Sequence, residues 1–207
     1  MAAVDSAARE ALAGQAARNP EDPFLFFRDP RGPFAWWSWR HAAAVADGED
    51  PGPRGAVPEA LLLAALAPVA AAESRLAELL AAKLATAGER EIWLSSAPLE
   101  ERAERIAARA ALIGGWAVVR EPGERLHPET VLWARPTLIV DAAPALLVLA
   151  VAIDRRAPRL GRARWLRRRL GRLRHLLVTA GDPDPVGAAF AALGAPGRVL
   201  PFPPDGW

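Results

Sequence analysis

The second half of the chain alternates short, strand-forming apolar runs with segments of helical periodicity. The strand-forming runs lie at residues 92–95, 116–120, 137–140, 175–179 and 198–200. The helical segments lie at residues 99–113, 128–134, 143–154, 161–173 and 184–193. Strands that are apolar along their whole length are typical of a parallel sheet with helices on both faces. We therefore predict an α/β fold with a mainly parallel sheet of about five or six strands.

The first half of the chain predicts an arm in front of this sheet. Residues 5–18 have the pattern of a short helix that ends at Asn19-Pro20. Residues 24–39 hold two β-prone runs around Asp-Pro-Arg-Gly-Pro, which predicts a β-hairpin. An apolar helix begins at Pro58-Glu59, restarts at Pro68 and runs to Gly88. We expect three parts: a helix and hairpin arm at 1–47, a linker at 48–58 and an α/β domain at 59–207.

The second strand of the hairpin contains Trp36 and Trp37 and leads to Trp39. We expect Trp37 to point away from the other two and favour packing against the α/β body. An exposed pair of these rings would instead indicate a partner surface.

Composition excludes several classes of site. The chain has no cysteine, which rules out disulfides and thiolate metal sites. His41, His127 and His175 lie far apart without a metal-binding spacing, so we expect no metal. The N-terminus has no apolar core of a signal peptide, and the longest apolar run, 142–153, is too short to cross a bilayer. We expect a cytoplasmic protein without a transmembrane segment; its oligomeric state stays open.

Basic residues concentrate in one segment. Residues 155–174 contain ten arginines and no acid, although the whole chain has a net charge of only +2. Apolar residues recur there at helical spacing, so we favour a helix docked on the sheet with a solvated arginine face. The alternative is an anion-binding surface for anionic lipid, an acidic partner or, less favoured, nucleic acid. Its candidate residues are Arg164, Arg167, Arg168, Arg169 and Arg172. Nucleic acid is less favoured because Trp165 is the only aromatic residue there.

Read in order, the segments resemble the large N-terminal domain of adenylate-forming enzymes, the acyl-CoA synthetase superfamily. The opening "ARNPEDPFLFFRDPRGPFAWWSWRHAAAVA" is similar to that family's helix and hairpin. "EREIWLSSAPLEERAERIAARAALIGGWAVVREPG" is similar to its central stretch of a strand with a Pro-Leu motif, a helix and a Gly-Gly-x-x-Val-Val strand. "LHPETVLWARPTLIVDAAPALLVLAVAI" and "LRHLLVTAGDPDPVGAAFAALG" resemble the segments that follow.

The resemblance implies a nucleotide site, but the motifs for that site depart from the family pattern. Gly52, Arg54 and Gly55 stand where the second half of the phosphate loop belongs. Its hydroxyl-rich first half is replaced by "DGEDP", whose carboxylates would repel a triphosphate. We therefore favour a linker at 48–58 over a working phosphate loop.

Two further motifs of the nucleotide site depart from the family pattern. The adenine-contacting Gly-Ala-Pro reads Gly181-Asp182-Pro183, and "LPFPPDGW" replaces the Tyr-Gly-x-Thr-Glu motif. The 207 residues contain no segment that resembles the family's mobile C-terminal domain, which carries its catalytic lysine, so we expect that domain to be absent. We assign no catalytic residue, and ATP or AMP is kept only as a candidate ligand of Gly52, Arg54, Gly55, Gly181 and Asp182.

Three hypotheses follow for function. The favoured one is a catalytically inactive domain, a pseudoenzyme, that acts as a structural or interaction module with a residual small-ligand cleft. The second is an electropositive module that binds through the arginine-rich segment. The third is a partial ligase that another chain completes. Asp141, after the 137–140 strand, is expected to cap the next helix and is also a candidate pocket residue.

Overall fold

The computed structural model describes residues 5–28, 34–50, 56–85, 91–96, 101–121, 126–195 and 197–202. The chain forms two compact units. Unit 1 comprises Met1–Glu91 and Pro98–Pro122, and unit 2 comprises Ile92–Ala97 and Gly123–Trp207. The predicted boundaries at 47–48 and 58–59 stay a prediction.

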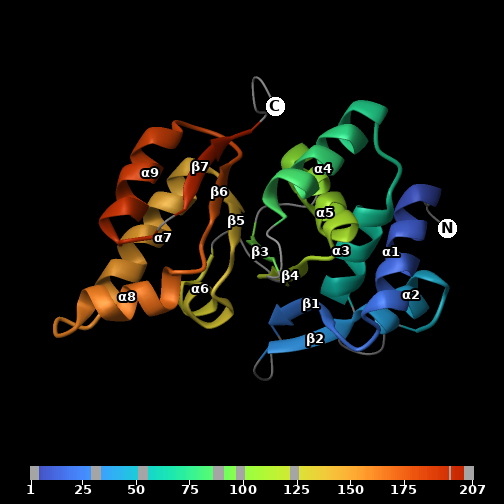
Figure 1. The fold of residues 1–207 in the computed structure, drawn as a ribbon, viewed down its shortest axis with the longest axis horizontal. Coiled ribbons are helices and arrows are strands. Elements are labelled where there is room, and N and C mark those ends of the chain that lie inside the picture. Colours follow the sequence, from blue (N-terminus) through green and yellow to red (C-terminus); the bar gives the residue numbers. More distant parts are fainter. Residues whose placement is uncertain are drawn as a thin grey trace. The chain divides into compact units, whose positions relative to one another are not determined.

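Unit 1 packs helices against three strands (Figure 1). Its strands are β1 (Pro23–Arg28), β2 (Phe34–Ser38) and β4 (Ala117–Arg120). β1 lies between the other two, antiparallel to β2 and parallel to β4. The helices are α1 (Ser6–Arg18), α2 (Trp39–Ala46), α3 (Ala56–Leu66), α4 (Ala71–Leu84) and α5 (Arg102–Gly114). α4 ends at Leu84, earlier than predicted, and Gly88 lies outside the described residues.

Unit 2 is an alternation of parallel strands and helices. Its strands are β3 (Ile92–Ser95), β5 (Leu138–Asp141), β6 (His175–Val178) and β7 (Arg198–Pro201), in the order β3-β5-β6-β7. Each neighbouring pair is parallel. The helices are α6 (Pro128–Ala134), α7 (Ala143–Arg156), α8 (Arg162–Leu170) and α9 (Pro183–Ala192). The predicted fold, α/β with a mainly parallel sheet, helices on both faces and an N-terminal helix and β-hairpin, is confirmed.

Strands β3, β4, β5 and β6 are largely buried, and most of their residues are apolar on both faces. Every residue of β4 and β5 is buried, and so are the last three residues of β3 and β6. Parallel strands covered on both sides need such continuous apolar runs. For this reason the strands are recognised in the sequence as continuous apolar runs and not as alternating apolar and polar residues.

The expected orientation of the three tryptophans is wrong. Trp37 and Trp39 are both buried, and Trp36 is 50% exposed. Trp39 begins α2 and stacks on Phe24 with ring centroids 3.8 Å apart. Trp37 reaches the core from β2, whereas Trp39 reaches it as the first residue of α2, so strand alternation does not relate the two rings. Core packing holds for these two rings.

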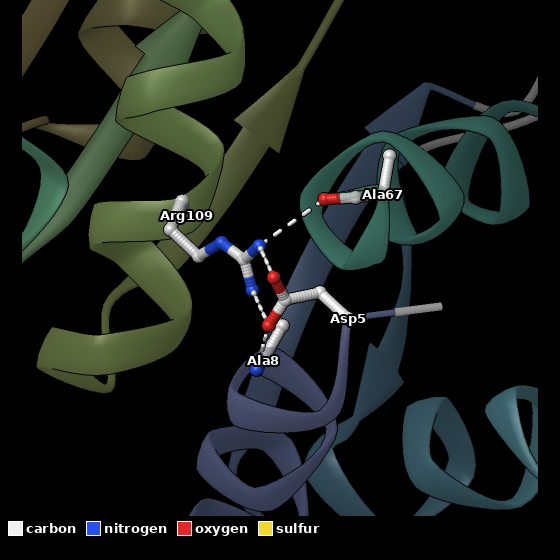
Figure 2. A network of polar contacts seen from close by, with 4 residues as sticks. All are labelled: Asp5, Ala8, Ala67 and Arg109. Atoms are coloured by element: carbon white, nitrogen blue, oxygen red, sulfur yellow. Dashed lines mark hydrogen bonds and ion pairs between the residues drawn. The ribbon is translucent and has the colours of Figure 1, made fainter. Parts of the chain in front are cut away.

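A partly buried polar network joins three segments of unit 1 (Figure 2). The Asp5 carboxylate caps α1 by accepting from the Ala8 backbone N–H at 3.0 Å. The Arg109 guanidinium, on α5, lies 3.2 Å from Asp5 Oδ2 and donates to the Ala67 carbonyl oxygen at 3.1 Å. The Ala8 hydrogen bond and the Arg109 charge hold the pKa of Asp5 below its ordinary value, although burial opposes them. The network fixes the start of α1 against α5 and the end of α3.

A left-handed glycine ends α5 and turns the chain into β4. Gly115 has φ of +69°, and the Trp116 N–H closes the turn on the Ala111 carbonyl oxygen at 2.9 Å. The side-chain amide of the buried Gln15 donates to the Ile113 carbonyl oxygen at 3.2 Å. Gly114 and Gly115 thus form the helix-to-strand turn between α5 and β4.

Among the described residues, no single helix has the length and apolar composition needed to cross a bilayer. The α3 and α4 segments reach that length only as a pair bent by 114°.

Candidate functional site

The carboxyl ends of the unit 2 strands are where a ligand is expected. In open parallel sheets, ligands bind beyond the carboxyl ends of the strands, where loops and helix N-termini converge. In this unit the edge is formed by Ser96 after β3, Asp141 at the end of β5, residues 179–182 after β6 and Phe202 after β7. The candidate nucleotide residues Gly181 and Asp182 therefore lie at the expected edge.

Ser96 and Asp141 form a buried pair at this edge. The Ser96 hydroxyl donates to Asp141 Oδ2 at 3.1 Å, and the Ala142 N–H donates to Asp141 Oδ1 at 2.8 Å. Both carboxylate oxygens thus have partners inside the protein, and both side chains are buried. Ala142, rather than Asp141, is the N-cap of α7, so the predicted cap is wrong. The side chain of Asp141 stabilises the turn and leaves little acceptor capacity for a ligand.

The start of α9 holds the other candidate residues. Asp182 is its N-cap, and the Asp182 carboxylate accepts from the Asp184 N–H at 3.0 Å. Pro183 and Pro185 have no N–H. Helix N-termini bind anions through free N–H groups. In this first turn the only N–H before Val186 is bonded internally, and two carboxylates lie beside it. The geometry disfavours a phosphate or an adenylate here.

Gly181 shapes the same turn by packing closely on α7. It has φ of +87°, and a Cβ at this position would lie 3.0 Å from the Cβ of Ala143. The Ala143 N–H also donates to the Ala180 carbonyl oxygen at 2.8 Å. The glycine serves this backbone approach, so the structure gives it a packing role within unit 2.

The remaining nucleotide candidates, Gly52, Arg54 and Gly55, lie outside the described residues, as does Asp205. Within the part of the chain that the structure describes, no group of three or more His, Asp or Glu side chains could hold a metal ion.

The arginine candidates lie on and after α8. Arg164, Arg167, Arg168 and Arg169 are exposed on this helix, whose Leu166 and Leu170 are buried. Arg169 donates to the Leu132 carbonyl oxygen at 3.2 Å and lies 6.0 Å from the centroid of Trp165. Arg172 follows the helix and interacts with other groups of the protein. The docked helix with a solvated arginine face, favoured from the sequence, matches this arrangement.

Two exposed apolar features were missed by the sequence reasoning. Leu160, in the turn between α7 and α8, is 93% exposed. Val148 and Val151, with Leu147, Ala152 and the arginines 155 and 156, line a cavity of 390 Å³ on α7. The two valines stand i, i+3 apart and outside the face of α7 that holds the buried residues Leu146, Leu149, Ala150 and Ile153, and this spacing was the available signal. For Leu160, the flanking Pro158 and Gly161 indicated a turn but not its exposure.

Solved structures of adenylate-forming enzymes share the fold of this chain, which confirms the family resemblance at the level of fold. The nonribosomal peptide synthetase FmoA3 aligns with a TM-score of 0.64 at 16% identity, over 97% of this chain and 31% of its own. O-succinylbenzoate coenzyme A synthetase (MenE) from Bacillus subtilis, in complex with AMP, aligns with a TM-score of 0.58 at 14% identity. That alignment covers 93% of this chain and 59% of the synthetase. CmiS6 aligns with a TM-score of 0.56 at 14% identity, over 97% of this chain and 72% of its own.

No sequence-family profile and no curated protein matches the chain. The chain spans less than two thirds of the MenE and FmoA3 structures. The likeness therefore defines the fold, and the activities of those enzymes are not carried over with it.

Proposed function

We propose that this chain is a catalytically inactive domain of adenylate-forming fold, which acts in the cytoplasm as a structural or interaction module. The observation that carries the proposal is the first turn of α9. Asp182 and Asp184 place two carboxylates there, and Pro183 and Pro185 remove two N–H donors. The resemblance assigns this turn to adenine contact, and two carboxylates there would repel a polyanionic nucleotide nearby, while the prolines leave few N–H donors for it.

The sequence supports the same conclusion at two other motifs. Residues 47–50, which include Asp47, Glu49 and Asp50, replace the hydroxyl-rich half of the phosphate loop, and "FPPDGW" follows β7 where the resemblance implies Thr and Glu. Each departure removes groups that would hold phosphates or magnesium. Three independent losses favour a scaffold over an enzyme.

A nucleotide titration tests the proposal. The chain is titrated with ATP and with AMP, with and without Mg²⁺, and followed by tryptophan fluorescence and thermal unfolding. A ligand at a hundred times its dissociation constant would stabilise the fold by about 2.7 kcal/mol, a readily measured rise in melting temperature. We expect no saturable change at millimolar nucleotide.

A variant distinguishes a nucleotide site that is blocked by the two carboxylates from the lack of any nucleotide site. In Asp182→Ser/Asp184→Ala, a hydroxyl can still cap α9 while both carboxylates are gone. Binding by the variant alone would support the carboxylate block, whereas saturable binding by the unmodified chain would contradict the proposal. Adenylate formation from a carboxylic acid and ATP by the unmodified chain would contradict it directly and would favour the partner-completed ligase.

A further inference from the structure

The end of α7, the turn that follows it and α8 form a surface rich in unpaired arginines. We call residues 155–169 the basic tip; its turn projects from unit 2 in Figure 1. Five arginines of the tip are exposed, and their side chains have no ion pair or hydrogen bond among the described residues: Arg155, Arg159, Arg164, Arg167 and Arg168. Unit 2 as a whole has 13 arginines against seven acidic residues, so the tip is not neutralised by its own unit.

The other arginines of this segment have internal partners. Arg156 pairs with Glu129 on α6, and Arg162 pairs with Asp154 on α7. Burial raises the pKa of Glu129. Hydrogen bonds from its own N–H and from Arg156 outweigh burial and hold that pKa below its ordinary value, so the pair stays charged. These contacts hold α6, α7 and α8 together. They leave the five unpaired guanidinium groups directed to solvent.

An apolar side chain lies in the middle of this charge. Leu160 is 93% exposed and stands between Arg159 and Arg162 in the turn. The leucines of α8 itself cannot supply apolar contact to a partner, because Leu166 and Leu170 are buried in unit 2. The tip therefore presents a docked helix with an arginine face and one protruding aliphatic side chain at its turn.

We infer that the basic tip binds the surface of an anionic phospholipid bilayer. Guanidinium groups form paired hydrogen bonds with phosphate oxygens, and each arginine near an anionic surface strengthens binding by about fivefold. Leu160 would enter the boundary between headgroups and acyl chains, where an exposed aliphatic group is favourable. This inference rests on the proposed role as an interaction module and names its partner.

A lipid surface fits the tip better than nucleic acid. Binding to single strands relies on aromatic stacking platforms, and the ring of Trp165 is already approached by Arg169. A nucleic-acid backbone also offers no apolar layer for Leu160. Nucleic acid remains an outcome that the experiment distinguishes.

The first measurement is vesicle co-sedimentation of the full chain. Vesicles of phosphatidylcholine with about one third phosphatidylglycerol are compared with pure phosphatidylcholine, at about 50 and about 500 mM salt. We expect binding only to the anionic vesicles at low salt. Arg164→Glu/Arg167→Glu/Arg168→Glu should weaken that binding by at least about 100-fold, since each arginine contributes about fivefold.

The matched control changes net charge by the same amount in unit 1. Arg18, Arg40 and Arg75 are exposed on α1, α2 and α4, and Arg18→Glu/Arg40→Glu/Arg75→Glu should lose no more than about tenfold, a long-range effect of net charge. Equal loss in both triple variants would overturn the assignment to the tip. Absence of binding to anionic vesicles, or binding to a short DNA duplex but not to vesicles, would overturn the inference.

The absence of cysteine allows insertion to be followed directly. Leu160→Cys, labelled with an environment-sensitive dye, should show a blue-shifted emission on anionic vesicles. Ala17→Cys, exposed on α1, should show none, and a dye at 160 that stays in water would overturn the role of Leu160. These results are independent of the nucleotide titration, so a failure of this inference and a failure of the proposed inactivity are told apart.

Discussion

At the scale of single residues, Asp5 has more structural consequences than its position near the N-terminus suggests. Its carboxylate caps α1, and its backbone N–H donates to the Leu66 carbonyl oxygen at 2.9 Å. It is also the ion-pair partner of Arg109, which is only 3% exposed. A buried guanidinium without a carboxylate partner lowers the stability of the fold. The ion pair therefore ties the segment before α1 to α5 in unit 1.

Asp5→Asn tests this link and its pH dependence. Asparagine keeps the cap but removes the charge, so we expect a loss of about 2 kcal/mol in unfolding free energy at pH 7. The folded-state pKa of Asp5 is lowered. The stabilisation is therefore present in full above the unfolded-state pKa of about 3.9 and is lost as pH falls through the folded-state value.

Urea unfolding of both proteins between about pH 7 and pH 2.5 measures this difference. The two curves should converge at the acid end. Asp47→Asn, in an exposed pair with Arg9, is the control and should leave stability unchanged. A pH-independent gap between the Asp5 variant and the unmodified chain would refute the charge argument.

Some residue-scale facts were readable from the sequence and others were not. The burial of both Trp37 and Trp39 depends on β2 ending at Ser38 and α2 beginning at Trp39, a boundary that the hairpin predicted at residues 24–39 did not contain. The Ser96–Asp141 pair joins residues 45 positions apart. It depends on β3 lying beside β5, where Ser95 pairs with Val140, and no local pattern specifies that register.

At the scale of elements, the turn from α5 to β4 is the most constrained join in unit 1. Gly115 is left-handed, and a Cβ there would lie 2.8 Å from the Gln15 side-chain oxygen. Gly194, after α9, is also left-handed with φ of +72°, but nothing lies within 4 Å of its Cβ position. Comparing substitutions at the two glycines therefore separates the cost of a left-handed backbone, which both share, from the cost of a steric clash, which only Gly115 has.

Gly115→Ala and Gly194→Ala should therefore differ in cost. The left-handed backbone alone costs about 1 kcal/mol in Gly194→Ala, whereas displacement of Gln15 raises the loss in Gly115→Ala to about 2–3 kcal/mol. Chemical denaturation of the two variants measures this. Equal losses would mean that Gln15 gives way freely and does not brace the turn.

The elements themselves were largely predictable, because each is marked by its own run of residues. Every strand expected in the second half occurs within a residue or two of its predicted bounds. The strand order β3-β5-β6-β7 was not predictable, because it arises from packing between segments far apart in sequence. The loss of anion-binding groups at the candidate site could be predicted in part, because "GDPDP" contains two prolines and two acids. The hydrogen bond from the Asp184 N–H to the Asp182 carboxylate could be seen only in the structure.

At the scale of the whole molecule, a small net charge conceals an uneven distribution. Unit 1 has 13 basic and 17 acidic residues, whereas unit 2 has 13 basic and seven acidic residues. Exposed charges interact with a surface over about 10 Å at moderate salt. The attraction between the protein and a charged surface is therefore set by the charges on the protein face nearest that surface and not by the net charge of +2.

Cation-exchange chromatography at pH 7.5 measures this distribution without any lipid. The unmodified chain should be retained at low salt, because the exposed arginines of the basic tip meet the sulfonate surface. The triple glutamate variants at 164, 167 and 168 and at 18, 40 and 75 have identical net charge. The first should elute at clearly lower salt than the second, since only the first removes the concentrated patch. Coincident elution of the two variants would mean that retention follows net charge, and the basic tip would then have no distinct field for any anionic partner to recognise.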